Sequence, residues 1–272
     1  MEVKVSLTEG CSAKCESCLC HKIKNPRYMT FETWKRIISQ VVEHRHMINK
    51  FHFYSIGESL LHPDFQKFID YAHKHFKGTN IATVLITNGS IDLTKYDLSK
   101  VKEVIVSFNA YTKEVYERTI KLSWDNGLKN IKKAAELYPV QVHVLNFNNE
   151  QIEDMENELF NLKDNENIRI RISSKVDNQC GEFYESKDDI KRIPCSYIHV
   201  VFCFNPNGDL LRCAHDFHDS TIYGNIKDKS LQDFIKDKAV DLQNHINRNY
   251  EGICKDCNFN VNVNEAQFLR WL

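Results

Sequence analysis

Short apolar runs alternate with helical patterns along the first two thirds of the chain, and this alternation constrains the fold more than any other feature. Each run has the length of a strand, and most of the segments between them repeat apolar residues every three or four positions. Alternating strands and helices predict a parallel sheet built from βαβ units. The predicted strands cover residues 3–7, 51–55, 81–87, 103–108, 140–145 and 168–173.

The predicted helices lie between these strands. Thr30 is a candidate N-cap for the first helix, and Pro63 suits the first turn of the second. Six units are too few for a closed eight-stranded barrel, so the sheet is expected to remain open. The apolar faces are Trp34, Ile37, Ile38, Val41 and Val42; Phe65, Phe68, Ile69, Ala72 and Phe76; Leu128, Ile131, Ala135 and Leu137; and Ile152, Met155, Leu159 and Leu162.

Three cysteines, Cys11, Cys15 and Cys18, follow the first predicted strand on one tight loop. Gaps of three and two residues let three thiolates surround one face of an iron-sulfur cube and leave one iron without a protein ligand. A zinc knuckle completed by Cys20, or buried cysteines without metal, remain alternatives. In a parallel sheet, functional groups gather at the carboxyl ends of the strands, so the loop is expected at that face.

Composition limits the classes of function. The 36 lysines and arginines balance 37 aspartates and glutamates, which argues against a dedicated surface for nucleic acid or anionic membrane. No apolar run approaches the length of about 20 residues that spans a bilayer, and the start of the chain does not resemble a signal peptide. We therefore expect a cytoplasmic protein, in which ten cysteines are ligands more often than disulfides.

The character of the sequence changes near Glu182, which predicts two domains, residues 1–182 and 183–272. In the second, the runs 197–202 and 209–212 flank the turn residues 205–208 and predict a β-hairpin, followed by a helix from Leu231. Four further cysteines lie here and suit either structural zinc or a fully ligated cluster. They are Cys195, Cys213, Cys254 and Cys257.

Three cysteines stand outside these sets. Cys203 lies within the hairpin and is expected in the core, and Cys20 is expected to be structural. Cys180 lies at the domain junction, where a thiol could return a hydrogen atom to a substrate radical, although a structural role is favoured here too.

The arrangement of Cys11, Cys15 and Cys18 after a first strand resembles the CxxxCxxC motif of the radical S-adenosylmethionine (SAM) superfamily. The resemblance implies a partial (β/α)6 TIM-type barrel and a 4Fe-4S cluster whose open iron chelates SAM and generates a 5′-deoxyadenosyl radical. It also implies a low-potential electron donor such as flavodoxin or ferredoxin. Ser17 departs from the family, which usually has an aromatic residue before the third cysteine.

Further loops resemble SAM-binding positions of the family. Residues 55–63 are similar to its GGEP motif, with Ile56 and Ser59 as departures, and the resemblance implies that this glutamate and backbone bind the SAM amino group. Polar residues at the ends of later strands resemble family positions near the SAM ribose or carboxylate, but they could instead be ordinary turn residues. His143 and Arg171 could face the barrel lumen and meet SAM or substrate, or they could belong to a strand face exposed to solvent. The implied SAM contacts are Gly57, Glu58, Ser59, Asn88, Ser107, Asn109, Asn146 and Arg171.

The order of Cys195, Gly208, Cys213 and residues 224–226 resembles the Twitch domain, the short relative of the SPASM domain, as in radical SAM inosamine dehydrogenases. This implies an auxiliary 4Fe-4S cluster held by all four C-terminal cysteines, and hence two clusters in total. With no vacant iron, such a cluster can accept an electron but does not readily bind substrate.

We therefore expect a radical SAM oxidoreductase acting on a small polar substrate. Modification of a ribosomal peptide, by epimerisation or thioether formation, is the alternative within the same class. The chain begins almost directly on its first strand, without an added peptide-recognition domain, which favours the small substrate. A non-catalytic zinc or iron-sulfur binding module is the alternative of another class.

Overall fold

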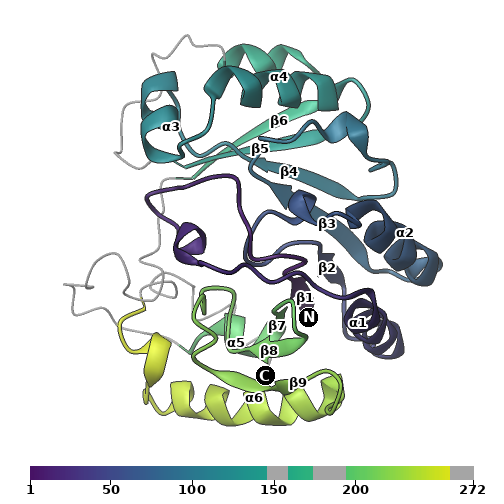
Figure 1. Cartoon of the computed structure of the whole chain (residues 1–272). Coiled ribbons are helices and arrows are strands. Elements are labelled where there is room, and N and C mark those ends of the chain that lie inside the picture. Colours follow the sequence, from purple (N-terminus) through teal and green to yellow (C-terminus); the bar gives the residue numbers. More distant parts are fainter. Residues whose placement is uncertain (146–158, 174–193, 258–272) are drawn as a thin grey trace.

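The computed structural model describes residues 1–145, 159–173 and 194–257. Six parallel strands lie in the order β6-β5-β4-β3-β2-β1, which confirms the predicted open (β/α)6 barrel (Figure 1). β1 and β2 end two and three residues earlier than predicted, and the other strand bounds agree within one residue. The strands are β1 Glu2–Val5, β2 Lys50–His52, β3 Ala82–Thr87, β4 Glu103–Ser107, β5 Val140–Leu145 and β6 Ile168–Ser173.

The helices follow the predicted pattern with one exception. The helix that carries Leu128 ends at Ala135, so the prediction that Leu137 belongs to its apolar face is wrong, and Leu137 is exposed. Thr30 caps the first helix by accepting a hydrogen bond from the Thr33 backbone N–H at 3.2 Å. Pro63 lies just before the second helix rather than in its first turn, because Asp64 is the N-cap. The helix predicted through residues 152–162 falls largely outside the described residues. The helices are α1 Phe31–Glu43, α2 Phe65–Phe76, α3 Lys113–Thr119 and α4 Trp124–Ala135.

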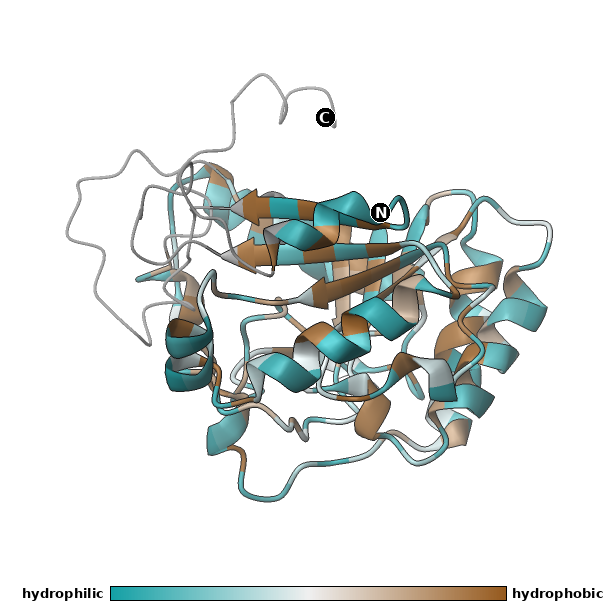
Figure 2. Cartoon of the chain, turned by 90° about the horizontal axis from the view of Figure 1, so that it is seen from above, coloured by the Kyte–Doolittle hydropathy of each residue, from teal (hydrophilic) through white to brown (hydrophobic). Residues whose placement is uncertain are grey.

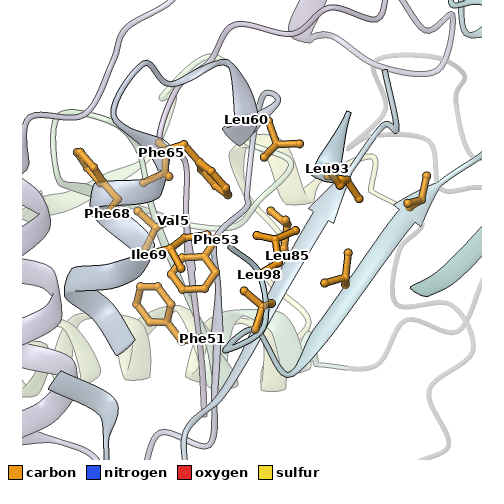
Figure 3. Packing of buried hydrophobic residues seen from close by; sticks show 14 of the residues in the cluster. Val5, Phe51, Phe53, Leu60, Phe65, Phe68, Ile69, Leu85, Leu93 and Leu98 are labelled. Carbon is orange, nitrogen blue, oxygen red and sulfur yellow. The ribbon is translucent and has the colours of Figure 1, made fainter. Parts of the chain in front are cut away.

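The core lies between the sheet and its outer helices. Figure 3 shows Phe51 and Phe53 from β2 and the loop after it packed close to Phe68 and Ile69 from α2. Trp34 from α1 is fully buried among these rings, and its indole N–H donates to the Phe68 carbonyl oxygen at 3.0 Å. Figure 2 shows strands that are mainly brown, some of them banded with teal, and helices that carry both teal and brown residues, as amphipathic helices on a core do.

The C-terminal part contains the predicted hairpin and helix. Asn205 and Gly208 close the turn between β7 and β8 through a backbone hydrogen bond of 3.0 Å. The prediction that the first hairpin strand begins at Tyr197 is wrong, because residues 196–200 form a short helix that buries Ile198. A short apolar run cannot be distinguished from a buried helical turn by periodicity alone. The elements are α5 Ser196–Val200, β7 Val201–Phe204, β8 Asp209–Leu211, β9 Ile222–Asn225 and α6 Leu231–Ile246.

The hairpin continues the barrel sheet. β7 pairs in parallel with β1, with Glu2 opposite Val201 and Lys4 opposite Cys203, which gives a nine-stranded sheet ending in β7-β8-β9. Cys203 is completely buried, as predicted. The predicted domain boundary near Glu182 lies outside the described residues. In the part that the structure describes, no helix is long and apolar enough to cross a membrane.

We expect Trp34→Ala to destabilise the protein by about 3–5 kcal/mol, because it removes a fully buried aromatic side chain and its hydrogen bond. Leu137→Ala is the control, since Leu137 is 57% exposed and should change stability by less than about 0.5 kcal/mol. Urea unfolding followed by circular dichroism measures both. Similar losses in the two variants would contradict the packing described here.

Candidate functional site

Two loops cross at the end of the sheet. The loop after β1 carries Cys11, Cys15 and Cys18, and the loop after β2 carries Gly57 and Glu58. The Glu58 backbone N–H donates to the Gly10 carbonyl oxygen at 2.8 Å. Gly57 has a φ of +88°, and a Cβ atom there would lie 2.1 Å from the Thr8 carbonyl oxygen. Only glycine allows this approach, which brings the cysteines and Glu58 together.

Glu58 is a carboxyl group prepared for a cationic partner. Its side chain is buried and accepts hydrogen bonds from the Asn88 backbone N–H at 2.7 Å and the Thr87 hydroxyl at 3.0 Å. Burial raises the pKa of Glu58 to about 7, although these hydrogen bonds oppose the shift. Among the described residues no lysine, arginine or histidine pairs with it, so a positively charged ligand group would match this site.

The three N-terminal thiols line one cavity of about 320 Å³ together with Glu58 and Asn88. The Asn88 side-chain amide donates to the Cys11 sulfur at 3.5 Å and to the Ser12 hydroxyl at 3.0 Å. Burial raises the pKa of Cys11 to about 11 and that of Cys15 to about 12. Such thiols remain protonated until a metal replaces the proton.

Cys20 joins the two crossing loops. Its buried sulfur accepts the Gly57 backbone N–H at 3.1 Å. A hydrogen bond with Cys20 lowers the pKa of the Cys18 thiol. From the spacing of the cysteines alone, this structural role of Cys20 could not be distinguished from that of a fourth metal ligand in a zinc knuckle.

The C-terminal part also contributes to this cavity. Tyr197 follows Cys195 by two residues, and Ala214 and His215 follow Cys213 directly. The Lys4 ammonium group, from β1, donates a hydrogen bond to the Tyr197 hydroxyl. These residues could not be predicted as cavity residues, because the pairing of β1 with β7 brings them to the first cysteine loop. Further lining residues include Lys4, Tyr54, Ser55, Tyr197, Ala214, His215 and Phe217.

The C-terminal cysteines are electrostatic neighbours. Burial raises the pKa of Cys195 and of Cys254 to about 12, and the nearby thiols of Cys213 and Cys257 add to both shifts. The His215 backbone N–H donates to the Cys213 sulfur at 3.4 Å. In the described ranges no three cysteine, histidine, aspartate or glutamate side chains are close enough to hold a single metal ion.

Only some of the remaining predicted site residues line the cavity. Ser107 and Asn109 line the cavity, as Gly57, Glu58 and Asn88 do. Ser59 is buried in a short 3-10 helix, and does not line the cavity. Arg171 is exposed on β6 opposite His143, and neither residue lines the cavity. Asn146 and Cys180 lie outside the described residues.

Sequence comparison agrees with this geometry. A model of the Radical SAM superfamily matches residues 5–162, and a model of an iron-sulfur cluster-binding domain, SPASM, matches residues 195–258. The first match covers more than half of the chain, and the chain therefore belongs to the radical SAM superfamily. Its second part is a SPASM-type iron-sulfur domain. No curated protein matches the chain by sequence.

Solved structures share the fold at low identity. BtrN in complex with AdoMet and 2-DOIA is 16% identical, with a TM-score of 0.66 over 94% of this chain and 92% of BtrN. anSMEcpe with AdoMet and the Kp18Cys peptide is 16% identical, with a TM-score of 0.66 over 99% of this chain and 95% of that one. Streptococcus suis SuiB bound to its precursor peptide SuiA is 15% identical, with a TM-score of 0.64 over 94% and 69%.

Replacing Gly57 by alanine should destabilise the protein by more than about 3 kcal/mol, because the new methyl group collides with the Thr8 carbonyl oxygen. Gly78→Ala is a matched control. Gly78 also has a positive φ, of +79°, but nothing lies within 4 Å of an added Cβ, so about 1 kcal/mol of strain is expected. Thermal unfolding of both variants compares them, and equal losses would exclude the close contact as the cause.

Proposed function

We propose that this protein is a radical SAM oxidoreductase that oxidises a small polar substrate, with an auxiliary 4Fe-4S cluster as the acceptor of one electron. Cys11, Cys15 and Cys18 would hold the first cluster. The second would be held by the four C-terminal cysteines, Cys195, Cys213, Cys254 and Cys257. When bound, the first cluster and SAM supply a 5′-deoxyadenosyl radical as hydrogen-atom acceptor. A low-potential donor such as flavodoxin or ferredoxin would reduce the protein.

Glu58 supports the assignment of SAM. Its buried carboxyl group faces the cavity of the three thiols and has no cationic partner among the described residues. The ammonium group of SAM would provide that partner, and the Asn88 amide would orient the neighbouring Cys11 sulfur. Ser107 and Asn109, on the same cavity, can donate and accept hydrogen bonds toward the polar groups of SAM.

The oxidation is supported by one cavity that contains residues from both parts of the chain. The three N-terminal thiols line it together with Ala214 and His215, which directly follow Cys213. A substrate in this cavity would lie near both proposed clusters. Tyr54 and Tyr197 also line this space.

Oxidation of an alcohol to a ketone removes one hydrogen atom from carbon, one proton from oxygen and one electron. The hydrogen atom would go to the deoxyadenosyl radical and the electron to the auxiliary cluster. The proton would need an acceptor, and the imidazole of His215 lines the cavity and can accept one. The Lys4 ammonium group has no lone pair, and burial raises the pKa of Tyr197 well above its ordinary value, so the Tyr197 hydroxyl, which accepts from Lys4, would donate a hydrogen bond to the substrate instead.

The described cavity of about 320 Å³ would also hold the first cluster and SAM, so the room it leaves suits a small molecule or a single peptide side chain. BtrN was solved with 2-DOIA, and SuiB and anSMEcpe were solved with peptides, so the fold accepts both classes. A peptide substrate therefore stays the alternative.

Cysteine variants should separate the two proposed clusters. Anaerobically reconstituted native protein should hold about eight irons, as two cubes require, and should cleave SAM to 5′-deoxyadenosine under a strong reductant. Cys254→Ala should retain about four irons and still cleave SAM, whereas Cys11→Ala should retain about four irons and cleave none. Iron analysis and chromatography of the nucleoside measure these results.

Cys203→Ala is the control for these variants, because this buried thiol lies outside both sets and its loss should leave the iron count unchanged. Zinc in the native protein, or iron without SAM cleavage, would contradict the proposed activity and favour a binding module.

The affinity for SAM should depend on the charge of Glu58. Below about pH 7 the free protein holds a proton on this carboxyl group, and the SAM ammonium must displace it. Affinity should therefore rise about tenfold per pH unit well below pH 7 and level off above it. Equilibrium dialysis from about pH 6 to about pH 8 measures this.

Glu58→Gln should bind SAM at least about tenfold more weakly at pH 8 and lose the slope, since a charged hydrogen bond is removed. Glu43→Gln, at a surface position of α1, should keep the native profile. A Glu58→Gln variant with native affinity and slope would exclude this role.

A further inference from the structure

A buried lysine in α6 lies on the helix face that contacts Cys195 and Arg212, the residue before Cys213. Lys238 is 2% exposed, and among the described residues its Nζ has no hydrogen-bond partner. Two rings partly surround it, with Nζ 5.2 Å from the centroid of Tyr223 and 5.8 Å from that of Phe202. The proposed reaction as described so far assigns this residue no role.

A buried ammonium group without an anion is costly, and contact with aromatic rings offsets only part of that cost. Asp241, on the same helix, is already engaged. Asp241 pairs with Arg212 at 2.9 Å and accepts a hydrogen bond from the Tyr223 hydroxyl. Lys238 therefore needs another source of negative charge if it remains protonated.

The neighbours of the α6 face that carries Lys238 indicate where this negative charge would lie. His245 lies seven residues further along the same face, and its Nδ1 accepts the Cys195 backbone N–H at 3.3 Å. Asp241, three residues after Lys238, holds Arg212, the residue directly before Cys213. Side chains on this face of α6 thus contact the backbone of Cys195 and the side chain of Arg212, which precedes Cys213.

The charges around Lys238 agree with this placement. The thiols of Cys195, Cys203 and Cys213 all favour its charged form, whereas burial lowers its pKa. A cluster bound by four thiolates carries net negative charge, and gains one more negative charge on reduction. Such a cluster would be the counter-charge that the described side chains do not provide.

We propose that Lys238 is a positioning residue that supplies a fixed positive charge to the auxiliary cluster and favours its reduced form. The inference rests on the proposed assignment of the four cysteines. A cation as buried as Lys238 is weakly screened by water, so it raises the reduction potential of a nearby cluster. The cluster then accepts the electron from the substrate radical more readily.

The test is the reduction potential of the auxiliary cluster, measured by anaerobic redox titration with electron paramagnetic resonance on the reconstituted full chain. The signal of the other cluster is recognised by its change on addition of SAM. Lys238→Met, which preserves volume and removes charge, should shift the potential to more negative values by about 59 mV or more, a tenfold change in the one-electron equilibrium. Lys238→Gln, also neutral, should shift it in the same direction.

Two controls define the outcome. Lys238→Arg keeps the charge and should stay nearer the native potential, and Lys236→Met, on the exposed face of α6 with a side chain 71% accessible, should leave it unchanged. Neutral variants with full iron content and the native potential would overturn the role of Lys238 and leave the proposed function intact. Native protein without a second cluster would overturn both.

Discussion

Backbone pairing between β1 and β7 is the interaction on which the rest of the structure depends. Glu2 to Val5 pair with Val201 to Phe204, and without these bonds β1 would be an exposed edge of the barrel sheet. The pairing places Lys4 beside Cys203 and brings Tyr197 to the cavity of the first cysteine loop. The iron-sulfur domain is thus built as an extension of the barrel, and residues close to Cys195 and Cys213 in sequence line the cavity of the first cysteine loop.

Side-chain contacts reinforce the same junction. Glu9, which is 4% exposed, accepts hydrogen bonds from the Arg27 backbone N–H at 3.0 Å and from its Nε at 2.8 Å. The same guanidinium group reaches Asp219, after β8, at 2.6 Å. This partly buried network joins the loop after β1 to the C-terminal part, and with the close approach at Gly57 it holds the residues around the cavity in position.

Local patterns were sufficient to predict the six strands, the cap at Thr30 and the positions of both cysteine sets, because each depends on residues close together in sequence. The joining of β1 to β7 could not be predicted, since no periodicity relates Glu2 to Val201. For the same reason Lys4 and Tyr197 were missed as cavity residues, and the helical turn at Ile198 was taken as strand. Arg171 was taken as a candidate contact because alternation on β6 does not say which face meets the cavity.

Two different clusters are proposed beside one cavity, and only the first of them would bind SAM. Electron paramagnetic resonance of the anaerobically reduced, reconstituted protein, recorded with and without SAM, distinguishes the two. We expect two 4Fe-4S signals, of which one changes on addition of SAM and the other does not, because four thiolates leave no vacant iron. A single signal, or two signals that are both unaffected by SAM, would contradict this proposal.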